Sequence, residues 1–322
     1  MSEQDVLSAA QQFTRLLEHV DRELRRTGIT IPPPEVKEQV TRAFWALFEV
    51  AERYQNEHAQ EDLSDLKARF RQIIIPWLCR SRYYWRSILK PHGYSGDYVM
   101  VEWMYDLEDG AGNDPTQPAL VNCLDYTFAT IHSVRSLWER RRWFASLLQE
   151  EFSRNENLSI LDVGCGGARY IRDFLSTKSA LRGMQLTLLD QDAAAIAFAK
   201  NHALAAWREH IHAVTAPIKH ITAVLPEAEY DVIISAGLFD YLSDDQAAML
   251  IRYLLSQIKA GGVLAISNFH PDDKSAVCKD WGADWRIFFR EEDAVAGLFP
   301  KFETVQISRS ANKALAYAWL RA

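Results

Sequence analysis

Residues 160–168, ILDVGCGGA, form an apolar, strand-like run that passes directly into a glycine-rich turn. A helix is expected to follow at residues 170–175. Glycines in such a turn let the backbone bend tightly toward the helix N-terminus and come into contact with a bound ligand. Glycine turns occur in most α/β proteins, so on its own this stretch indicates an α/β fold and only weakly a nucleotide site.

Short β-branched and apolar runs recur after this turn, at residues 185–190, 211–216, 230–237 and 261–269. Segments of helix length, or loops leading into them, separate these runs. This arrangement is typical of a parallel sheet whose strands are buried on both faces. The tail, residues 302–320, predicts two strands joined by a short turn, which is an antiparallel hairpin. Residues 156–322 are therefore predicted to form a doubly wound, mostly parallel sheet that ends in this hairpin.

Residues 1–155 have a different character, because glycine is scarce and apolar residues recur at helical spacing. Helices are expected at residues 16–24, at residues 40–51 after a proline-rich breaker, at residues 64–75 with an N-cap at Ser64 and an interruption at Pro76, and at residues 124–152. Between the last two, an aromatic-rich stretch at residues 80–118 is interpreted as irregular. We predict that residues 1–155 form a helical cap, or substrate-lid, domain.

Composition limits the class of protein. The length of 322 residues suits two modules, and 48% apolar with 25% charged residues excludes wholesale disorder. A net charge of −7 argues against a nucleic-acid partner. No apolar run reaches 18 residues and residues 1–13 do not resemble a signal peptide, so we expect no membrane span and a cytoplasmic protein. The four cysteines are widely spaced, so they are expected to be reduced thiols, and no metal site is predicted.

Two aspartates accompany the glycine turn. Asp162 lies two positions before Gly164, and Asp190 ends the next expected strand. An acidic side chain at the end of that strand can accept hydrogen bonds from both hydroxyls of a ribose. For Asp190 the alternative is an N-cap of the following helix, and for the glycines it is a purely structural turn.

Together these features resemble the class I S-adenosylmethionine (SAM)-dependent methyltransferases, over roughly residues 156–322. In that family an acidic residue precedes a GxGxG turn, the second strand ends in an acid, and the sheet ends in an antiparallel hairpin. An NAD-type Rossmann domain is the alternative, but it normally carries GxGxxG and requires neither the preceding acid nor the hairpin. In this chain Ala168 stands at the third glycine position, beside Gly167.

The resemblance implies a Rossmann-like, seven-stranded sheet with SAM as the cofactor. The residues implied to contact SAM are Asp162, Gly164 and Gly166 at its amino-acid end, Asp190 at the ribose, Pro217 and Ile218 near the adenine, and Phe239 and Tyr241 beside the sulfonium. For Phe239 and Tyr241, ordinary core packing is an equal alternative.

Aromatic and basic residues are concentrated at residues 80–106. A sulfonium cation is attracted to aromatic faces by roughly 0.5–2 kcal/mol each, and an aromatic lid would keep water away from the transferred group. We therefore assign Trp85 and Tyr98 to the cofactor site, and Tyr94 together with Tyr241 to catalysis. The alternative is an interdomain packing face, because aromatic side chains supply large buried areas.

His92 and His270 are the candidate general bases, since each lies in a motif at the edge of the expected lid or of a strand. A hydroxyl or amine acceptor needs such a base, whereas a carboxylate acceptor needs none. For both histidines the alternative is a capping or solvent-exposed side chain.

Three segments narrow the resemblance: KPHGYSGDYVMVEWMY at residues 90–105, SNFHP at 267–271 and DWRIFFREED at 284–293. They resemble a bacterial subfamily that includes the methyltransferase forming 3-hydroxypalmitic acid methyl ester. SAM-cyclising enzymes that make azetidine-2-carboxylate are similar in their helical cap. We predict a methyltransferase acting on a small molecule, a carboxylate or other acidic acceptor. The alternatives are a SAM-cyclising lyase and a catalytically silent SAM-binding scaffold.

Overall fold

A computed structural model of the protein describes residues 1–108, 113–178, 183–225, 229–300 and 304–322. The chain divides into two compact units. The helical unit comprises Met1–Arg135 and Lys274–Arg286, and the sheet unit comprises Ser136–Asp273 and Ile287–Ala322. The boundary thus lies 20 residues before the expected one at residue 155, and a short segment of the second half belongs to the first unit.

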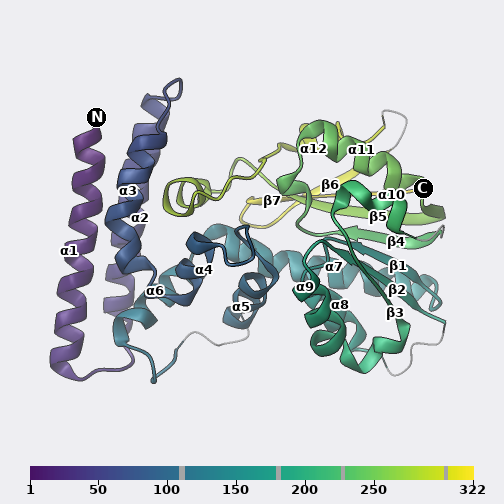
Figure 1. Ribbon diagram of the computed structural model, residues 1–322, viewed down its shortest axis with the longest axis horizontal. Helices are drawn as coiled ribbons and strands as arrows, with labels where there is room; N and C mark the ends of the chain where they lie inside the picture. The colour runs from purple at the N-terminus through teal and green to yellow at the C-terminus, as the bar shows by residue number, and fades with distance from the viewer. Residues whose placement is uncertain (109–112, 179–182, 226–228, 301–303) are drawn as a thin grey trace. The chain divides into compact units, whose positions relative to one another are not determined.

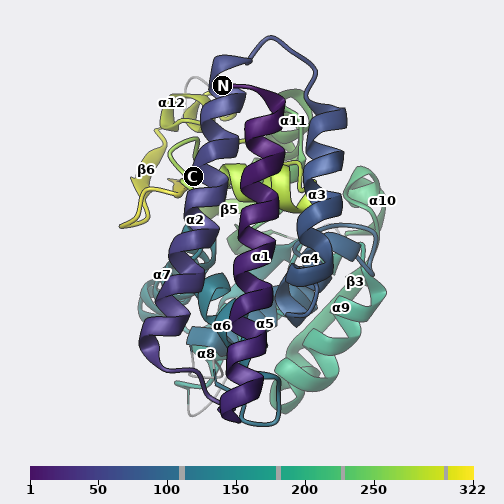
Figure 2. The same ribbon diagram turned by 90° about the vertical axis from the view of Figure 1, so that its left-hand side faces the viewer.

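In the described part of the helical unit, six complete α-helices follow one another: α1 (Glu3–Thr27), α2 (Pro34–Glu57), α3 (Ser64–Leu78), α4 (Arg82–Leu89), α5 (Tyr98–Glu108) and α6 (Ala119–Ala129). The long helix α1 lies between α2 and α3, and the three run side by side (Figure 2). Their apolar stripes face one another: the rings of Phe13 and Phe44 are centred 6.3 Å apart, and those of Phe48 and Phe70 5.8 Å apart. Among the described residues, no helix combines the length and the apolar character needed to cross a membrane.

The stretch at residues 80–118 contains two helices, α4 and α5, where an irregular segment was expected. A buried ion pair joins them: Arg86 Nε of α4 lies 2.7 Å from Asp97 Oδ1, and the same oxygen accepts the Met100 N–H in the first turn of α5. Charge pairing and helix capping over 11 residues therefore stabilise helices that the local apolar pattern does not reveal.

Two further helices differ from expectation. The third begins after Leu63 as its N-cap, and it continues through Pro76 to Leu78, so the proline, which lies in the last turn, does not end the helix. The helix expected at residues 124–152 is interrupted at Thr130, which separates α6 from α7 (His132–Arg154).

Seven strands form one sheet in the sheet unit: β1 (Ser159–Val163), β2 (Gln185–Asp190), β3 (Ile211–Thr215), β4 (Tyr230–Ser235), β5 (Ile258–Phe269), β6 (Gln306–Arg309) and β7 (Leu315–Arg321). Their order is β3-β2-β1-β4-β5-β7-β6. The first five are parallel, whereas β7 pairs with β5 and β6 in antiparallel register (Figure 1). The expected strands and the terminal hairpin are therefore confirmed.

Helices cover both faces of this sheet (Figure 1). Neighbouring residues of β1 point in opposite directions: Ile160 packs in a cluster with α7, α8 (Arg169–Leu175) and α9 (Ala193–Phe198). Leu161 packs in a second cluster with α10 (Ile221–Val224), α11 (Asp244–Leu255) and α12 (Glu292–Ala296). Burial on both faces explains the unbroken apolar runs of the strands, and it confirms the doubly wound α/β fold.

Candidate cofactor site

The turn that follows β1 has left-handed backbone at every second residue. The φ angles are 72° at Gly164, 51° at Gly166 and 53° at Ala168, the three positions of a GxGxG pattern. Only glycine adopts this conformation without steric cost, so Ala168 is strained by about 1–2 kcal/mol. Because Ala168 adopts the conformation of the missing glycine, the turn keeps the geometry of the pattern despite the substitution.

The same turn lies against the segment that follows β4. A Cβ atom added at Gly164 would lie 3.1 Å from Leu238 Cβ, closer than side chains normally approach. Glycine is therefore required here by space as well as by φ. Since β1 pairs with β2 on one side and with β4 on the other, the end of β1 is the point where the strand order reverses, and ligands of open α/β sheets bind at such points.

Asp190, at the end of β2, holds the glycine turn. Its Oδ2 accepts the Gly166 N–H at 2.9 Å, and its Oδ1 accepts the Asp192 N–H at 2.9 Å. The side chain is buried, and this burial raises the pKa of Asp190 despite the backbone hydrogen bonds. Its alternative role as a helix cap is filled by Asp192, whose carboxylate accepts the Ala194 N–H of α9. A carboxylate has four acceptor positions, so Asp190 retains capacity for further donors.

Asp162 lies beneath the turn and is fully buried. The hydroxyl of Tyr170, in α8, lies 2.7 Å from both of its oxygens. Burial raises the pKa of Asp162 to about 7, against the opposing effects of the Tyr170 hydroxyl and of the positive charge of Arg140. Its position at the amino-acid end of SAM stays a prediction.

Sequence reasoning missed Arg140. This arginine of α7 is only 6% exposed, and its Nη1 would lie 3.0 Å from a Cβ atom added at Gly237, just beyond β4. A guanidinium therefore lies at the strand-order reversal, near Asp162 and the end of β4. The sequence carries a signal for it: Arg140 is spaced at i, i+4 and i+8 with Phe144 and Leu148, on the buried stripe of an otherwise charged helix.

Of the residues expected to contact SAM after β3 and β4, some are exposed and others are buried in the core. Pro217 is exposed and caps the short 3-10 helix that starts at Ile218, whose side chain is half-buried. Phe239 is fully buried within the apolar cluster under α11, which favours the packing interpretation for this side chain. Tyr241 is 37% exposed and so presents part of its ring at the surface.

His270, directly after β5, is buried and hydrogen-bonded at both ring nitrogens. Nε2 lies 2.9 Å from Glu292 Oε2, while Nδ1 accepts the Asp272 N–H at 3.0 Å and lies 2.8 Å from Arg309 Nη2. Two donors at Nδ1 fix the proton on Nε2, where it is donated to Glu292. This geometry favours a structural role, and the assignment of His270 as a base is not carried further.

The other expected site residues belong to the helical unit. Trp85 is 39% exposed on α4, while His92, Tyr94 and Tyr98 are half-buried. The rings of His92 and Tyr98 meet edge to face with centroids 5.5 Å apart. Their roles in cofactor binding and catalysis stay predictions.

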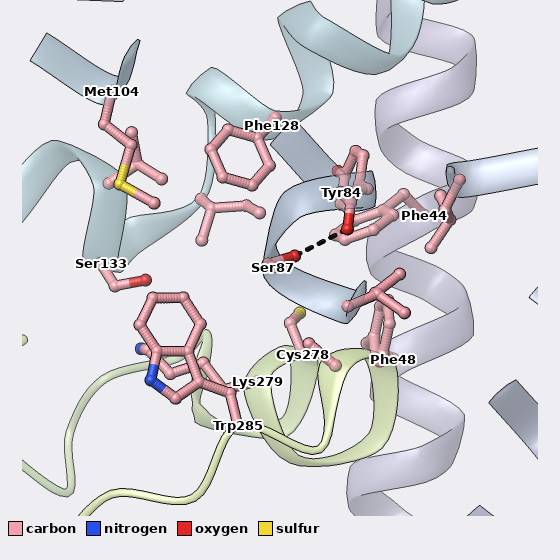
Figure 3. Close-up of a pocket in the computed structure, with 16 residues that line it drawn as sticks. Phe44, Phe48, Tyr84, Ser87, Met104, Phe128, Ser133, Cys278, Lys279 and Trp285 are labelled. Carbon is pink, nitrogen blue, oxygen red and sulfur yellow. Dashed lines mark hydrogen bonds between the residues drawn. The ribbon is translucent and has the colours of Figure 1, made fainter. Parts of the chain in front are cut away.

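The helical unit also contains a pocket of its own (Figure 3). Its walls are mostly apolar, with Phe44 and Phe48 from α2, Met104 from α5 and Phe128 from α6. Tyr84 lines it too, and within the described part of the chain its buried hydroxyl has no hydrogen-bond partner. The pocket adjoins the aromatic segment, but Trp85, His92, Tyr94 and Tyr98 are not among its lining residues.

The strand order and the glycine turn together define the fold class of the sheet unit. It is a Rossmann-like fold whose last strand, β7, runs antiparallel to β5. Residues 161–264 match the family model described as a methyltransferase domain. Residues 161–264 of the sheet unit are thus similar to a methyltransferase domain, and SAM is the cofactor of SAM-dependent methyltransferases.

Among the curated proteins that match parts of the chain are two O-methyltransferases. The ubiquinone biosynthesis O-methyltransferase of Leptothrix cholodnii is 25% identical over 158 residues, 49% of this chain and 61% of that protein. The malonyl-[acyl-carrier protein] O-methyltransferase of Bacillus cereus is 30% identical over 124 residues, 38% of this chain and 42% of that protein. The chain therefore spans less than two thirds of the length of either relative.

A solved structure resembles the whole chain in fold. The crystal structure of a possible exported protein from Bordetella parapertussis covers 100% of this chain and 97% of its own, with a TM-score of 0.56 and 16% identity. At this identity the likeness is one of fold alone, and it extends the similarity to residues outside the methyltransferase domain.

Proposed function

We propose that this protein is a SAM-dependent methyltransferase that acts on a small molecule, a carboxylate or another acidic oxygen acceptor. The observation that carries the proposal is the hydrogen bond of 2.9 Å between the Gly166 N–H and Asp190 Oδ2. It joins a left-handed glycine turn to a buried carboxylate at the point where the strand order reverses. The match of residues 161–264 to a methyltransferase domain supports this interpretation.

The residues of the turn fit SAM. Gly164 adopts its left-handed conformation without a side chain that would crowd Leu238, and Asp190 keeps acceptor positions for a ribose. We assign Gly164 and Gly166, with Asp162 beneath them, to the amino-acid end of the cofactor, and Pro217 and Ile218 to the adenine. Bound SAM supplies a methyl group that its sulfonium has already activated. What the chain contributes is alignment and the exclusion of water.

An oxygen acceptor is favoured because both matched relatives are named as O-methyltransferases. A carboxylate acceptor is already nucleophilic and needs no general base. With a hydroxyl acceptor, His92 is the remaining candidate base, because the two ring nitrogens of His270 are occupied. We place Trp85, Tyr94 and Tyr98 of the helical unit, and Tyr241 of the sheet unit, at the site as its aromatic components.

Analysis of the nucleoside products tests the reaction class. Purified protein is incubated with SAM, alone and with panels of carboxylic acids and phenols. S-adenosylhomocysteine that forms only with an acceptor is the expected result. Methylthioadenosine formed without an acceptor would show that SAM is cyclised, and SAM binding by calorimetry with neither product formed would leave a catalytically silent scaffold.

Paired variants test the cofactor site. Asp190→Asn should weaken SAM binding by about 1–3 kcal/mol, because the amide cannot accept from the ribose and from Gly166 as the carboxylate does. Asp192→Asn is the matched control, since asparagine caps a helix as well as aspartate. Equal SAM affinity of the two variants by calorimetry would reject the ribose assignment.

A further inference from the structure

Arg290 is an arginine of the sheet unit that is almost completely buried, with 3% of its surface exposed. It lies just before α12, and its backbone N–H donates to Phe269 O at 2.9 Å, which anchors it at the end of β5. In the sequence it stands in a polar run, REED, at residues 290–293, within the segment DWRIFFREED, and no hydrophobic periodicity singles it out.

Its guanidinium donates to four oxygens. Two are backbone carbonyls of the segment after β4, Phe239 O at 2.9 Å and Leu242 O at 2.5 Å. The others are Asn268 Oδ1 at 2.6 Å, near the end of β5, and Asp244 Oδ1 at 2.9 Å, in the first turn of α11. One planar group therefore ties the segment at residues 239–242 to β5 and to α11.

The partners of the Arg290 guanidinium indicate that its role is more than the formation of an ion pair. A buried guanidinium normally faces a buried carboxylate, but the side chain of Asp244 is 80% exposed. Neutral carbonyl and amide oxygens supply the remaining acceptors. Two of these acceptors are backbone carbonyls of residues 239–242, and a third belongs to β5. Arg290 can therefore form all of these hydrogen bonds only while residues 239–242 keep one conformation relative to β5.

A second set of hydrogen bonds fixes the same segment. Asp240 Oδ1 accepts the Phe269 N–H at 2.7 Å, and Asp240 O accepts the Phe288 N–H at 2.7 Å. Leu238, directly before the segment, is the residue that lies against Gly164 of the cofactor turn. A shift of residues 239–242 would therefore move Leu238 and change the packing against Gly164 in the turn after β1.

We propose that Arg290 is a positioning residue of the cofactor site: it holds residues 239–242, and through Leu238 it holds the wall that faces Gly164. This inference rests on the proposed function for its effect on SAM. Its structural part, the immobilisation of residues 239–242, stands independently of that function.

Arg321 provides a matched control at the opposite edge of the sheet. It also donates to a carboxylate and to a backbone carbonyl, with Nη1 3.0 Å from Glu151 Oε2 and 2.8 Å from Gly261 O. It lies at the end of β7, opposite Val263, far along the strands from the glycine turn. Loss of Arg321 should destabilise the sheet unit without moving residues 239–242.

The test compares Arg290→Lys, Arg290→Met and Arg321→Met by calorimetric titration with SAM, by thermal unfolding, and by hydrogen exchange at residues 239–242. We expect both Arg290 variants to lose SAM affinity by about tenfold or more and to exchange faster in this segment, with Lys only partly restoring both. Arg321→Met should lower the unfolding temperature but keep SAM affinity within about twofold.

SAM affinity and hydrogen exchange together distinguish failure of the proposed function from failure of the positioning role of Arg290. If the wild-type protein binds no SAM, the proposed function fails, and exchange at residues 239–242 still decides whether Arg290 holds the segment. If the wild-type protein binds SAM and Arg290→Lys matches Arg321→Met in both affinity and exchange, Arg290 is not a positioning residue. Should Arg290→Met not fold, Arg290→Lys alone decides, because it keeps the charge and loses the planar group.

Discussion

The two edges of the sheet hold their charged side chains in different ways. At the edge where the parallel strands begin, the charges form ion pairs in contact with water. Arg321, paired with Glu151, is 38% exposed, and Lys259, paired with Asp231, is 37% exposed. Water partly screens such pairs, so they contribute less than fully buried charges, although the Glu151 side chain itself is only 6% exposed.

At the edge where the parallel strands end, three charged groups around the glycine turn and the segment after β4 are buried and hydrogen-bonded mainly to neutral groups. Asp162 accepts from a tyrosine hydroxyl, Asp190 from backbone N–H groups, and Arg290 donates mostly to carbonyl and amide oxygens. Each arrangement costs desolvation that an ion pair would have offset. Buried titratable groups of this kind cluster at functional sites, so the comparison favours this edge as the position of the proposed site without reference to any motif.

The largest effect is expected from Gly164→Ala. The substitution forces alanine into a left-handed conformation and brings its Cβ to 3.1 Å from Leu238, which together should cost about 2–6 kcal/mol of unfolding free energy. SAM affinity should fall as well, because the wall of the turn moves. Chemical denaturation and calorimetry measure the two effects.

Gly261→Ala is the control at the opposite edge. Gly261 has a φ of 80°, but a Cβ atom added there meets nothing within 4 Å. This variant should therefore show only the backbone strain, about 1–3 kcal/mol, with SAM affinity unchanged. If the two variants lost equal stability and equal affinity, the crowding at Gly164 would have no functional meaning.

A smaller and pH-dependent effect is expected from Tyr170→Phe. Burial raises the pKa of Asp162 to about 7, so the contribution of this carboxyl to stability falls as the pH rises from about 4 to about 7. The Tyr170 hydroxyl opposes that rise by stabilising the charged form. Its removal should cost about 1–3 kcal/mol at pH 8, where the buried carboxylate is charged, and less at pH 5.

Tyr230→Phe is the matched control, at the start of β4. The Tyr230 hydroxyl is buried, and among the described residues it has no hydrogen-bond partner. Its removal should leave stability unchanged or slightly raised, equally at pH 5 and pH 8. A loss for Tyr170→Phe that is the same at both pH values would contradict the raised pKa of Asp162.

The sequence was most informative where one local pattern determines the structure. Two-sided burial gave the strands their apolar runs, so β1, β2 and β4 could be predicted, as could the terminal hairpin. The register of the glycine turn followed from Asp162 and Gly164, and the left-handed φ of Ala168 shows that register to be correct.

Structure that depends on distant partners was not predictable in this way. The segment at residues 274–286 belongs to the helical unit because of contacts such as Trp281 Nε1 to Gln55 Oε1 and Lys67 Nζ to Asp280 Oδ2. No periodicity encodes such pairs. Arg290 was missed for the same reason, since two of its acceptors are backbone carbonyls, which every residue possesses.

The smallest effect is expected at the water-exposed edge, from Lys259→Met. Lys259 Nζ lies 2.8 Å from Asp231 Oδ2, and this carboxylate oxygen also accepts the Ser159 N–H at 2.8 Å, so Asp231 keeps a partner when the lysine is lost. The pair should contribute about 0–1 kcal/mol to unfolding, and less in 1 M salt, where charges are screened within about 3 Å. SAM affinity should not change. Denaturation at low and high salt measures the difference. If Lys259→Met lost as much unfolding free energy as Gly164→Ala, the charged groups at the two edges would not differ in their contribution to stability.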